Sequence, residues 1–202
     1  MRVGVLAVQG AVSEHLDALR RAAERRGLAV EAVPVRTAED LQDVHGLVLP
    51  GGESTTISRL LRSGRLQGPL LDRARAGSLA VFGTCAGLIL LSSRAVRDVE
   101  GKDIQLLGLL DAEVDRNAFG RQRDSFEARL DVAGVGAMPA VFIRAPVLTQ
   151  AWAPTQVLAR NARGIVAVRK GRVLGTAFHP ELTPDTRLHE LFLELAREAS
   201  GG

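Results

Sequence analysis

The chain has 202 residues, of which 46% are hydrophobic and 24% charged, with 26 basic residues against 23 acidic ones. A length near 200 favours a single domain over residues 1–202 that buries roughly 70% of its extended surface. The net charge of +3 gives no indication of nucleic-acid binding, and the single cysteine, Cys85, excludes an intramolecular disulfide. The sequence has neither a signal peptide nor an apolar run of roughly 18 residues, so we expect a cytoplasmic protein without membrane association.

The first half of the chain alternates apolar runs with amphipathic helical stretches. The runs predict buried strands at residues 3–9, 28–35, 46–49 and 79–82. A helix is expected to begin near Val12, capped by Ser13, and to end at Gly27. Gly68 and Pro69 separate two further helical stretches. Because parallel neighbours need crossover connections, this alternation predicts an α/β fold with a mostly parallel sheet, covered on both faces, and functional loops at the carboxyl ends of its strands.

After residue 104 the pattern changes to shorter, alternating strands. They are expected at residues 107–115, 126–132, 140–145, 157–160 and 165–178. A turn at Lys170 and Gly171 divides the last of them, which predicts some antiparallel pairing. The final helix carries four apolar residues at the spacing of one face, which is expected to dock on the sheet: Leu188, Leu191, Phe192 and Leu195. Its polar residues are expected to stay in solvent: Arg187, Glu190 and Glu194.

Residues 79–91 contain the strongest candidate for chemistry. A buried strand leads into Gly83-Thr84-Cys85-Ala86-Gly87, and an apolar helical run follows, which is the pattern of a nucleophile elbow. A thiol at the N-terminus of a helix is favoured as the thiolate by the unpaired N–H groups and the helix dipole. The N–H of Ala86 would then point to where an oxyanion develops. The alternative is that Cys85 is a small buried hydrophobic residue.

A thiolate nucleophile needs a base, and His179 is the histidine whose context suggests this role. It ends an apolar strand and precedes a proline, so we expect it to be extended. Residues i and i+2 of an extended chain project to the same side, which would bring the Glu181 carboxylate beside the imidazole, as in a catalytic triad. A surface His-Pro turn is the alternative. The other three histidines are interpreted as solvated residues of helices or a polar turn: His15, His45 and His189.

Three motifs resemble those of class I glutamine amidotransferases. They are LVLPGGEST at 47–55, GTCAGLILL at 83–91 and FHPEL at 178–182. Four segments resemble, more narrowly, the family of glutaminase subunits of pyridoxal 5′-phosphate synthase: VQGAVSEHL at 8–16, PGGESTTISRLL at 50–61, DRNAFGRQRDSFEA at 115–128 and VFIRAP at 141–146. The resemblance implies a three-layer αβα sandwich of the flavodoxin-like type, with some antiparallel strands in the C-terminal half.

The resemblance also implies a reaction and its residues. L-Glutamine would be hydrolysed to L-glutamate and ammonia through a thioester on Cys85, with His179 and Glu181 completing the triad and the N–H groups of Gly52 and Ala86 forming the oxyanion hole. The implied glutamine-binding residues are Gly52, Glu53, Ser54, Arg116, Ile143 and Arg144. No metal or other cofactor is implied.

The implied partner is the synthase (lyase) subunit, which receives the ammonia within a large hetero-oligomer. The loop at Gln9 and Gly10 and the first helix are candidates for part of that interface.

Three alternatives remain at the level of sequence. A glutaminase serving another acceptor, such as the one of imidazole glycerol phosphate synthesis, would share triad and fold. A cysteine hydrolase of the DJ-1 type has a similar elbow, but typically with histidine directly after the nucleophile, where this chain has Ala86. A non-catalytic regulatory subunit would not need Cys85, His179 and Glu181 together.

Overall fold

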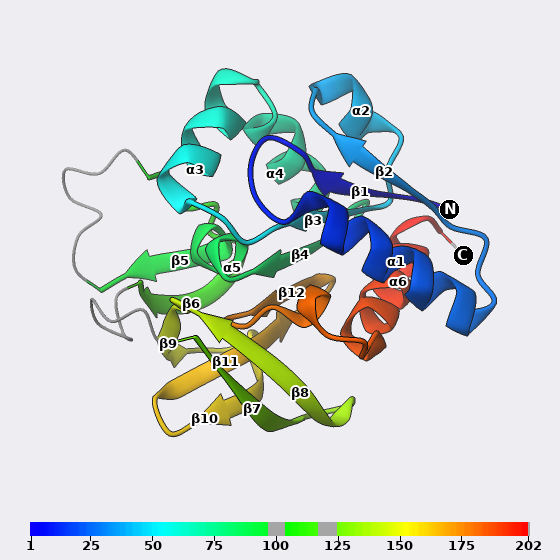
Figure 1. Ribbon diagram of the computed structural model, residues 1–202. Helices are drawn as coiled ribbons and strands as arrows, with labels where there is room; N and C mark the ends of the chain where they lie inside the picture. The colour runs from blue at the N-terminus through cyan, green and yellow to red at the C-terminus, as the bar shows by residue number, and fades with distance from the viewer. Residues whose placement is uncertain (97–103, 117–124, 202) are drawn as a thin grey trace.

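A mixed sheet of ten strands forms the centre of the part of the chain that this computed structural model describes, residues 1–96, 104–116 and 125–201 (Figure 1). Its strands are β1 (Arg2–Leu6), β2 (Glu31–Val35), β3 (Gly46–Leu49), β4 (Ala80–Thr84), β5 (Ser92–Ala95), β6 (Leu110–Asp115), β9 (Val147–Ala151), β10 (Gln156–Asn161), β11 (Gly164–Lys170) and β12 (Val173–Thr176). The order across the sheet is β2-β1-β3-β4-β12-β11-β9-β6-β5, and β10 pairs with β11. The predicted α/β class with a mixed sheet is confirmed.

The sheet is parallel from β2 to β12, since β2, β1, β3, β4 and β12 pair in the same direction, and β5 and β6 at its other edge are parallel too. All four residues of β3 are buried, as expected for a strand covered on both faces. The helices are α1 (Val12–Arg26), α2 (Ala38–Gln42), α3 (Ser54–Ser63), α4 (Gln67–Arg75), α5 (Ala86–Leu91) and α6 (Arg187–Ala199), and a 3-10 turn, η1, spans Pro180–Leu182. Helices α1 and α6 pack together, with α6 on β3 and β4, whereas α3 packs on α5 (Figure 1).

The C-terminal half introduces antiparallel strands. The turn predicted at Lys170 and Gly171 joins β11 to β12 as an antiparallel pair, and β11/β9 and β9/β6 are antiparallel too. A separate hairpin, β7 (Ser125–Val132) with β8 (Gly136–Ile143), crosses the lower front of the molecule in Figure 1. Its Phe142 ring stacks on Phe126 at a centroid distance of 4.7 Å and lies 5.6 Å from Phe178. The hairpin therefore packs onto the segment that precedes His179.

Several local expectations are corrected. Helix α1 has Ala11 as its N-cap residue and no side-chain cap, so Ser13 lies inside the first turn. Gly68 and Pro69 fall in the first turn of α4, where proline costs no hydrogen bond, and the break between α3 and α4 comes earlier, around Gly64. Strand β1 ends at Leu6 rather than continuing to residue 9. Strands β5 and β9 were not predicted.

The closing helix α6 buries the expected face, with Leu188, Phe192 and Leu195 inaccessible or nearly so. Its polar residues reach solvent in part, as expected, and each also has a partner. Arg187 pairs with Asp185 and Glu190 accepts a hydrogen bond from Thr186 at the start of the helix, whereas Glu194 pairs with Arg26 of α1. No helix in the described ranges has the length and apolar character needed to cross a membrane.

Candidate active site

Cys85 lies at a sharp turn between β4 and α5. Its backbone has φ +49° and ψ −101°, a conformation that costs non-glycine residues energy and is found mostly at functional sites. The turn leaves no room for a side chain at either glycine. A Cβ on Gly83 would lie 2.6 Å from the Gly87 carbonyl carbon, and a Cβ on Gly87 would lie 2.1 Å from the Leu49 oxygen. The two glycines of the motif therefore answer a packing need, and the cysteine takes the strained position of a nucleophile elbow.

His179 and Glu181 lie beside each other, as their spacing predicted. The imidazole Nδ1 is 2.7 Å from Glu181 Oε1, and the Glu181 side chain is fully buried. The backbone differs from the expectation, because Glu181 lies in the η1 turn rather than in extended chain. The His179 N–H donates to the Val141 carbonyl at 2.8 Å, so the β7/β8 hairpin fixes the segment that carries the imidazole.

The electrostatics of His179 favour its protonated form. Burial alone would lower the pKa of the imidazole, but hydrogen bonds with Cys85 and Glu181, and then the charges of these two groups, outweigh burial and raise the pKa to about 10. The imidazole is therefore cationic at neutral pH, with the Cys85 side chain as one of its hydrogen-bond partners. The Cys85 Sγ also lies 3.9 Å from the Ile143 carbonyl oxygen, which brings the end of β8 to the nucleophile.

The PGGES loop between β3 and α3 passes directly beside the Cys85 and His179 side chains. A Cβ built on Gly51 would lie 2.4 Å from His179 Cε1 and 3.5 Å from Cys85 Cβ. The Gly51 carbonyl accepts the Ala11 N–H at 3.2 Å, and the Glu53 N–H donates to Gln9 Oε1 at 2.9 Å. The loop before α1 thus holds the glycine loop in place, which explains why β1 ends before residue 9.

The remaining predicted substrate residues are only partly brought together. Arg116 Nη2 donates to the buried Ser54 Oγ at 2.9 Å. The Glu53 carboxylate caps α3 by accepting from the N–H groups of Thr55 and Thr56; burial opposes its charge, but these bonds lower its pKa. Gly52 and Arg144 are exposed. Residues 117–124 of the DRNAFGRQRDSFEA segment lie outside the described residues.

The interpretation of His15 and His189 as solvated is wrong, since both are fully buried. His15 Nε2 lies 3.5 Å from Glu181 Oε2, and its Nδ1 lies 3.0 Å from His189 Nε2. The sequence contained a signal for this. His15 shares its helix face with Leu19 and Ala22, and His189 shares its face with the buried apolar residues of α6. His45, the third of the set, is half-buried.

Gly51→Ala is expected to slow alkylation of Cys85 by iodoacetamide at neutral pH by about tenfold, because the new methyl group displaces the imidazole that stabilises the thiolate. Since the chain has a single cysteine, the mass of the alkylated protein reports on this thiol alone. Gly68→Ala is the matched control, because a Cβ at Gly68 meets nothing within 4 Å. Equal alkylation rates in both variants would show that Gly51 does not set the imidazole position.

The fold and the site define the class of the protein: an α/β protein with a cysteine at a nucleophile elbow and a His-Glu pair at the carboxyl edge of a parallel sheet. Residues 5–198 match the SNO glutamine amidotransferase family. The chain therefore belongs to that family, and the family predicted from its motifs is confirmed.

Two relatives of this chain bear the same name. A Frankia casuarinae protein is 54% identical, with 100% of this chain and 98% of that protein covered. A Brevibacillus brevis protein is 49% identical, with 98% of each covered. Both are named pyridoxal 5′-phosphate synthase subunit PdxT. A solved structure titled glutamine amidotransferase superposes with a TM-score of 0.85 at 47% identity, covering 96% of this chain and 98% of the other.

Proposed function

We propose that this chain is the glutaminase subunit of a pyridoxal 5′-phosphate synthase, hydrolysing L-glutamine to L-glutamate and ammonia. The observation that carries the proposal is Cys85 at the elbow with a protonated His179, held by Glu181, as its partner. Relatives that are about half identical over nearly the whole chain and named as subunits of that synthase support the choice of pathway.

The first half of the reaction forms a thioester. The Cys85 thiolate attacks the side-chain amide carbon of glutamine, and the carbonyl oxygen becomes an oxyanion held by the N–H groups of Ala86 and Gly52. The His179 imidazolium gives its proton to the amide nitrogen, the C–N bond breaks, and ammonia leaves. The proton needed by the leaving group is already on the imidazole before attack, since its pKa lies near 10.

The second half hydrolyses the thioester. His179, now neutral, takes a proton from water as the hydroxide attacks the acyl carbon, and the C–S bond breaks to release glutamate. The leaving sulfur returns as the thiolate beside the imidazolium, so the resting ion pair is restored. The Glu181 carboxylate holds the ring orientation and stabilises the imidazolium.

Substrate recognition is assigned to groups that fit an amino acid. The Arg116 guanidinium, held by Ser54, offers charge-assisted donors to the α-carboxylate of glutamine. The Ile143 carbonyl, beside the Cys85 sulfur, is an acceptor for the amide nitrogen. Glu53 contributes its backbone, since its carboxylate caps α3. Arg144, exposed after β8 with φ +42°, completes the set at the rim.

The proposed partner is the synthase subunit, in a hetero-oligomer that receives ammonia before it is protonated by bulk water. The loop at Gln9 and Gly10 and helix α1 form part of the proposed interface, because this loop touches both Gly51 and Glu53. The proposed compartment is the cytoplasm, whose reducing conditions keep a lone nucleophilic thiol free. The subunit is proposed to need no cofactor of its own.

The test is glutamate release from L-glutamine, measured with and without the synthase subunit of the same organism. We expect slow release by the chain alone and at least a tenfold increase with the synthase. Docking contacts at the Gln9 loop are one hydrogen bond away from the glycine loop that carries the proposed oxyanion donor, the Gly52 N–H. Stimulation by the acceptor subunit of imidazole glycerol phosphate synthesis instead would reassign the pathway. No release with either partner would reject the glutaminase activity.

A further inference from the structure

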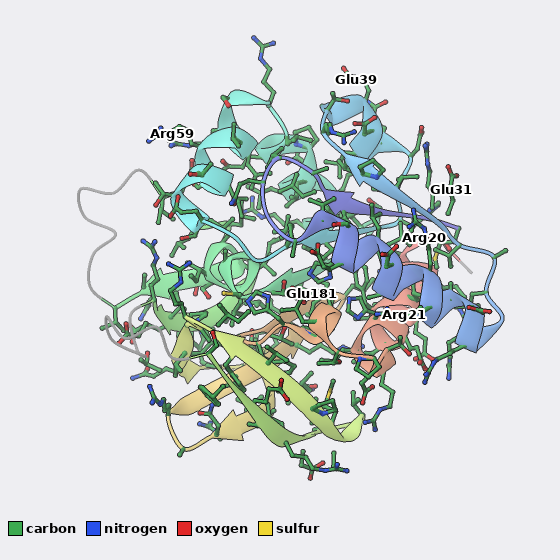
Figure 2. All side chains as sticks on the ribbon, viewed as in Figure 1. Arg20, Arg21, Glu31, Glu39, Arg59 and Glu181 are labelled. Carbon is green, nitrogen blue, oxygen red and sulfur yellow. The ribbon has the colours of Figure 1, made fainter. Side chains whose placement is uncertain are left out.

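A buried polar cluster lies directly behind Glu181, and the mechanism above does not use it. His15 of α1, His189 of α6 and Thr84 of β4 are all fully inaccessible to solvent. His15 Nε2 lies 3.1 Å from Thr84 Oγ1 and 3.5 Å from Glu181 Oε2, and His15 Nδ1 lies 3.0 Å from His189 Nε2. Figure 2 shows Glu181 near the centre of the molecule beside α1, whereas the labelled Glu39 and Arg59 reach its outer surface.

The two oxygens of Glu181 have different surroundings. Oε1 accepts from His179 Nδ1 at 2.7 Å. Oε2 is buried and has no hydrogen bond of ordinary length in the described part of the chain, and His15 Nε2 is the nitrogen that faces it. A buried carboxylate oxygen without a donor is costly, and such a carboxylate is driven toward its neutral form or toward another position. An N–H directed at Oε2 would prevent both.

The donors and acceptors around His15 and His189 indicate which ring nitrogens carry the protons. If His189 Nε2–H donates to His15 Nδ1, then His15 carries its proton on Nε2, between Thr84 Oγ1 and Glu181 Oε2. His189 Nδ1 is then the ring nitrogen without a hydrogen bond: its lone pair is buried and has no partner among the described residues. In the opposite assignment His189 Nδ1 carries a buried N–H without an acceptor, and His15 Nε2 turns a lone pair toward the Glu181 carboxylate. This arrangement costs more free energy.

Both imidazoles of the cluster stay neutral at neutral pH. Burial, and then the charges of His189 and His179, hold the pKa of His15 well below its usual value. Burial, and then the charge of Arg21, lower the pKa of His189 to about 3. A neutral imidazole supplies a donor without a second positive charge. The full charge of Glu181 therefore remains available to the His179 imidazolium, for which a cation at His15 would compete.

We propose that His15 is a positioning residue of this site: its Nε2–H fixes the second oxygen of Glu181, and through that carboxylate it sets the orientation and charge of His179. Helices α1 and α6 thereby contribute to the chemistry at the end of β4 without touching substrate. The catalytic part of this inference rests on the proposed glutaminase function, whereas the contact with Glu181 does not.

His15→Leu tests the proposal by removing the donor while keeping an apolar side chain of similar size. With the synthase present, we expect kcat for glutamine to fall by about 10- to 100-fold and KM to change less than about twofold. The reason is that the imidazolium loses its orientation, whereas the substrate keeps its contacts. His15→Gln, whose amide nitrogen reaches the place of Nε2, is expected to restore most of kcat. His45→Leu is the matched control and leaves both constants unchanged, because His45 precedes β3 at the end opposite Cys85.

A merely structural role for His15 would not move the pH profile. In His15→Leu the pKa of His179 is expected to fall from about 10, which moves the alkaline limb of kcat to lower pH, and the less well held imidazolium is expected to slow alkylation of Cys85 at neutral pH. Alkylation needs no glutamine. A wild-type chain that releases no glutamate would therefore reject the proposed function while leaving the role of His15 decided by the alkylation rate.

Unchanged kcat and an unchanged alkylation rate in folded His15→Leu would overturn the proposal, as would a Gln variant no better than the Leu variant. If His15→Leu does not fold, the imidazole nitrogen chemical shifts of the wild-type protein decide instead. A proton on His15 Nε2 is expected, and a proton on Nδ1 would overturn the proposal.

Discussion

Replacing Cys85 by serine is expected to reduce glutamate release by about 10⁴-fold or more, even with the synthase present. The reason lies in the charge of His179. The Cys85 side chain is itself a main cause of the His179 pKa of about 10, and a serine hydroxyl, which is far less acidic than a thiol, would have to pass its proton to a neutral imidazole before it could attack. The thiol needs no such help, because it is stabilised as a thiolate by the same imidazolium. Serine is therefore isosteric but inactive here.

The Cys85→Ser variant is expected to keep its fold and its ability to bind glutamine. The strained backbone at this position is set by the packing of Gly83 and Gly87, which serine leaves intact. Glutamine binding by calorimetry and synthase binding by ultracentrifugation should match the wild type, so the loss is one of chemistry. Full turnover in this variant would reject Cys85 as the nucleophile.

The elements that the sequence predicted well are those whose residues repeat one burial pattern. The run at 46–49 is buried on both faces and is strand β3 to the residue, and the elbow at Cys85 follows from two glycines. Strand β1 ends early because Gln9 leaves the sheet to bind the Glu53 N–H, a contact 44 residues away that no local pattern contains. Strands β5 and β9 are short and partly polar, and only their neighbours in the sheet make them strands.

The site shows the same division between local and long-range information. The i, i+2 spacing of His179 and Glu181 predicted their contact, although a 3-10 turn rather than extended chain produces it. The polarity of an imidazole does not reveal the histidine behind them; the buried helix face that His15 shares with apolar residues does. His15 and His189 are 174 residues apart, and only the packing of α1 on α6 makes them neighbours.

Glu181→Gln is expected to lower kcat by about 10³-fold while leaving KM for glutamine nearly unchanged. The amide keeps the size of the side chain and an acceptor oxygen but removes the negative charge that, together with the Cys85 side chain, raises the pKa of His179 to about 10. In the variant this pKa falls toward the ordinary histidine value of about 6.5. A larger share of the enzyme then lacks the proton that must leave with ammonia, and the imidazole also loses the charged partner that orients it, which accounts for the larger part of the loss.

The pH profile separates this explanation from a loss of stability. In the wild type kcat should hold from neutral pH upward and decline as His179 deprotonates near a pKa of about 10, whereas in Glu181→Gln the decline should begin at lower pH. Glu190→Gln makes the same chemical change at a half-buried carboxylate that accepts from Thr186, and it should leave the profile in place. An alkaline limb that stays near the wild-type pH in folded Glu181→Gln would mean that the cationic state of His179 depends on Cys85 alone, and the carboxylate would then serve only to orient the ring.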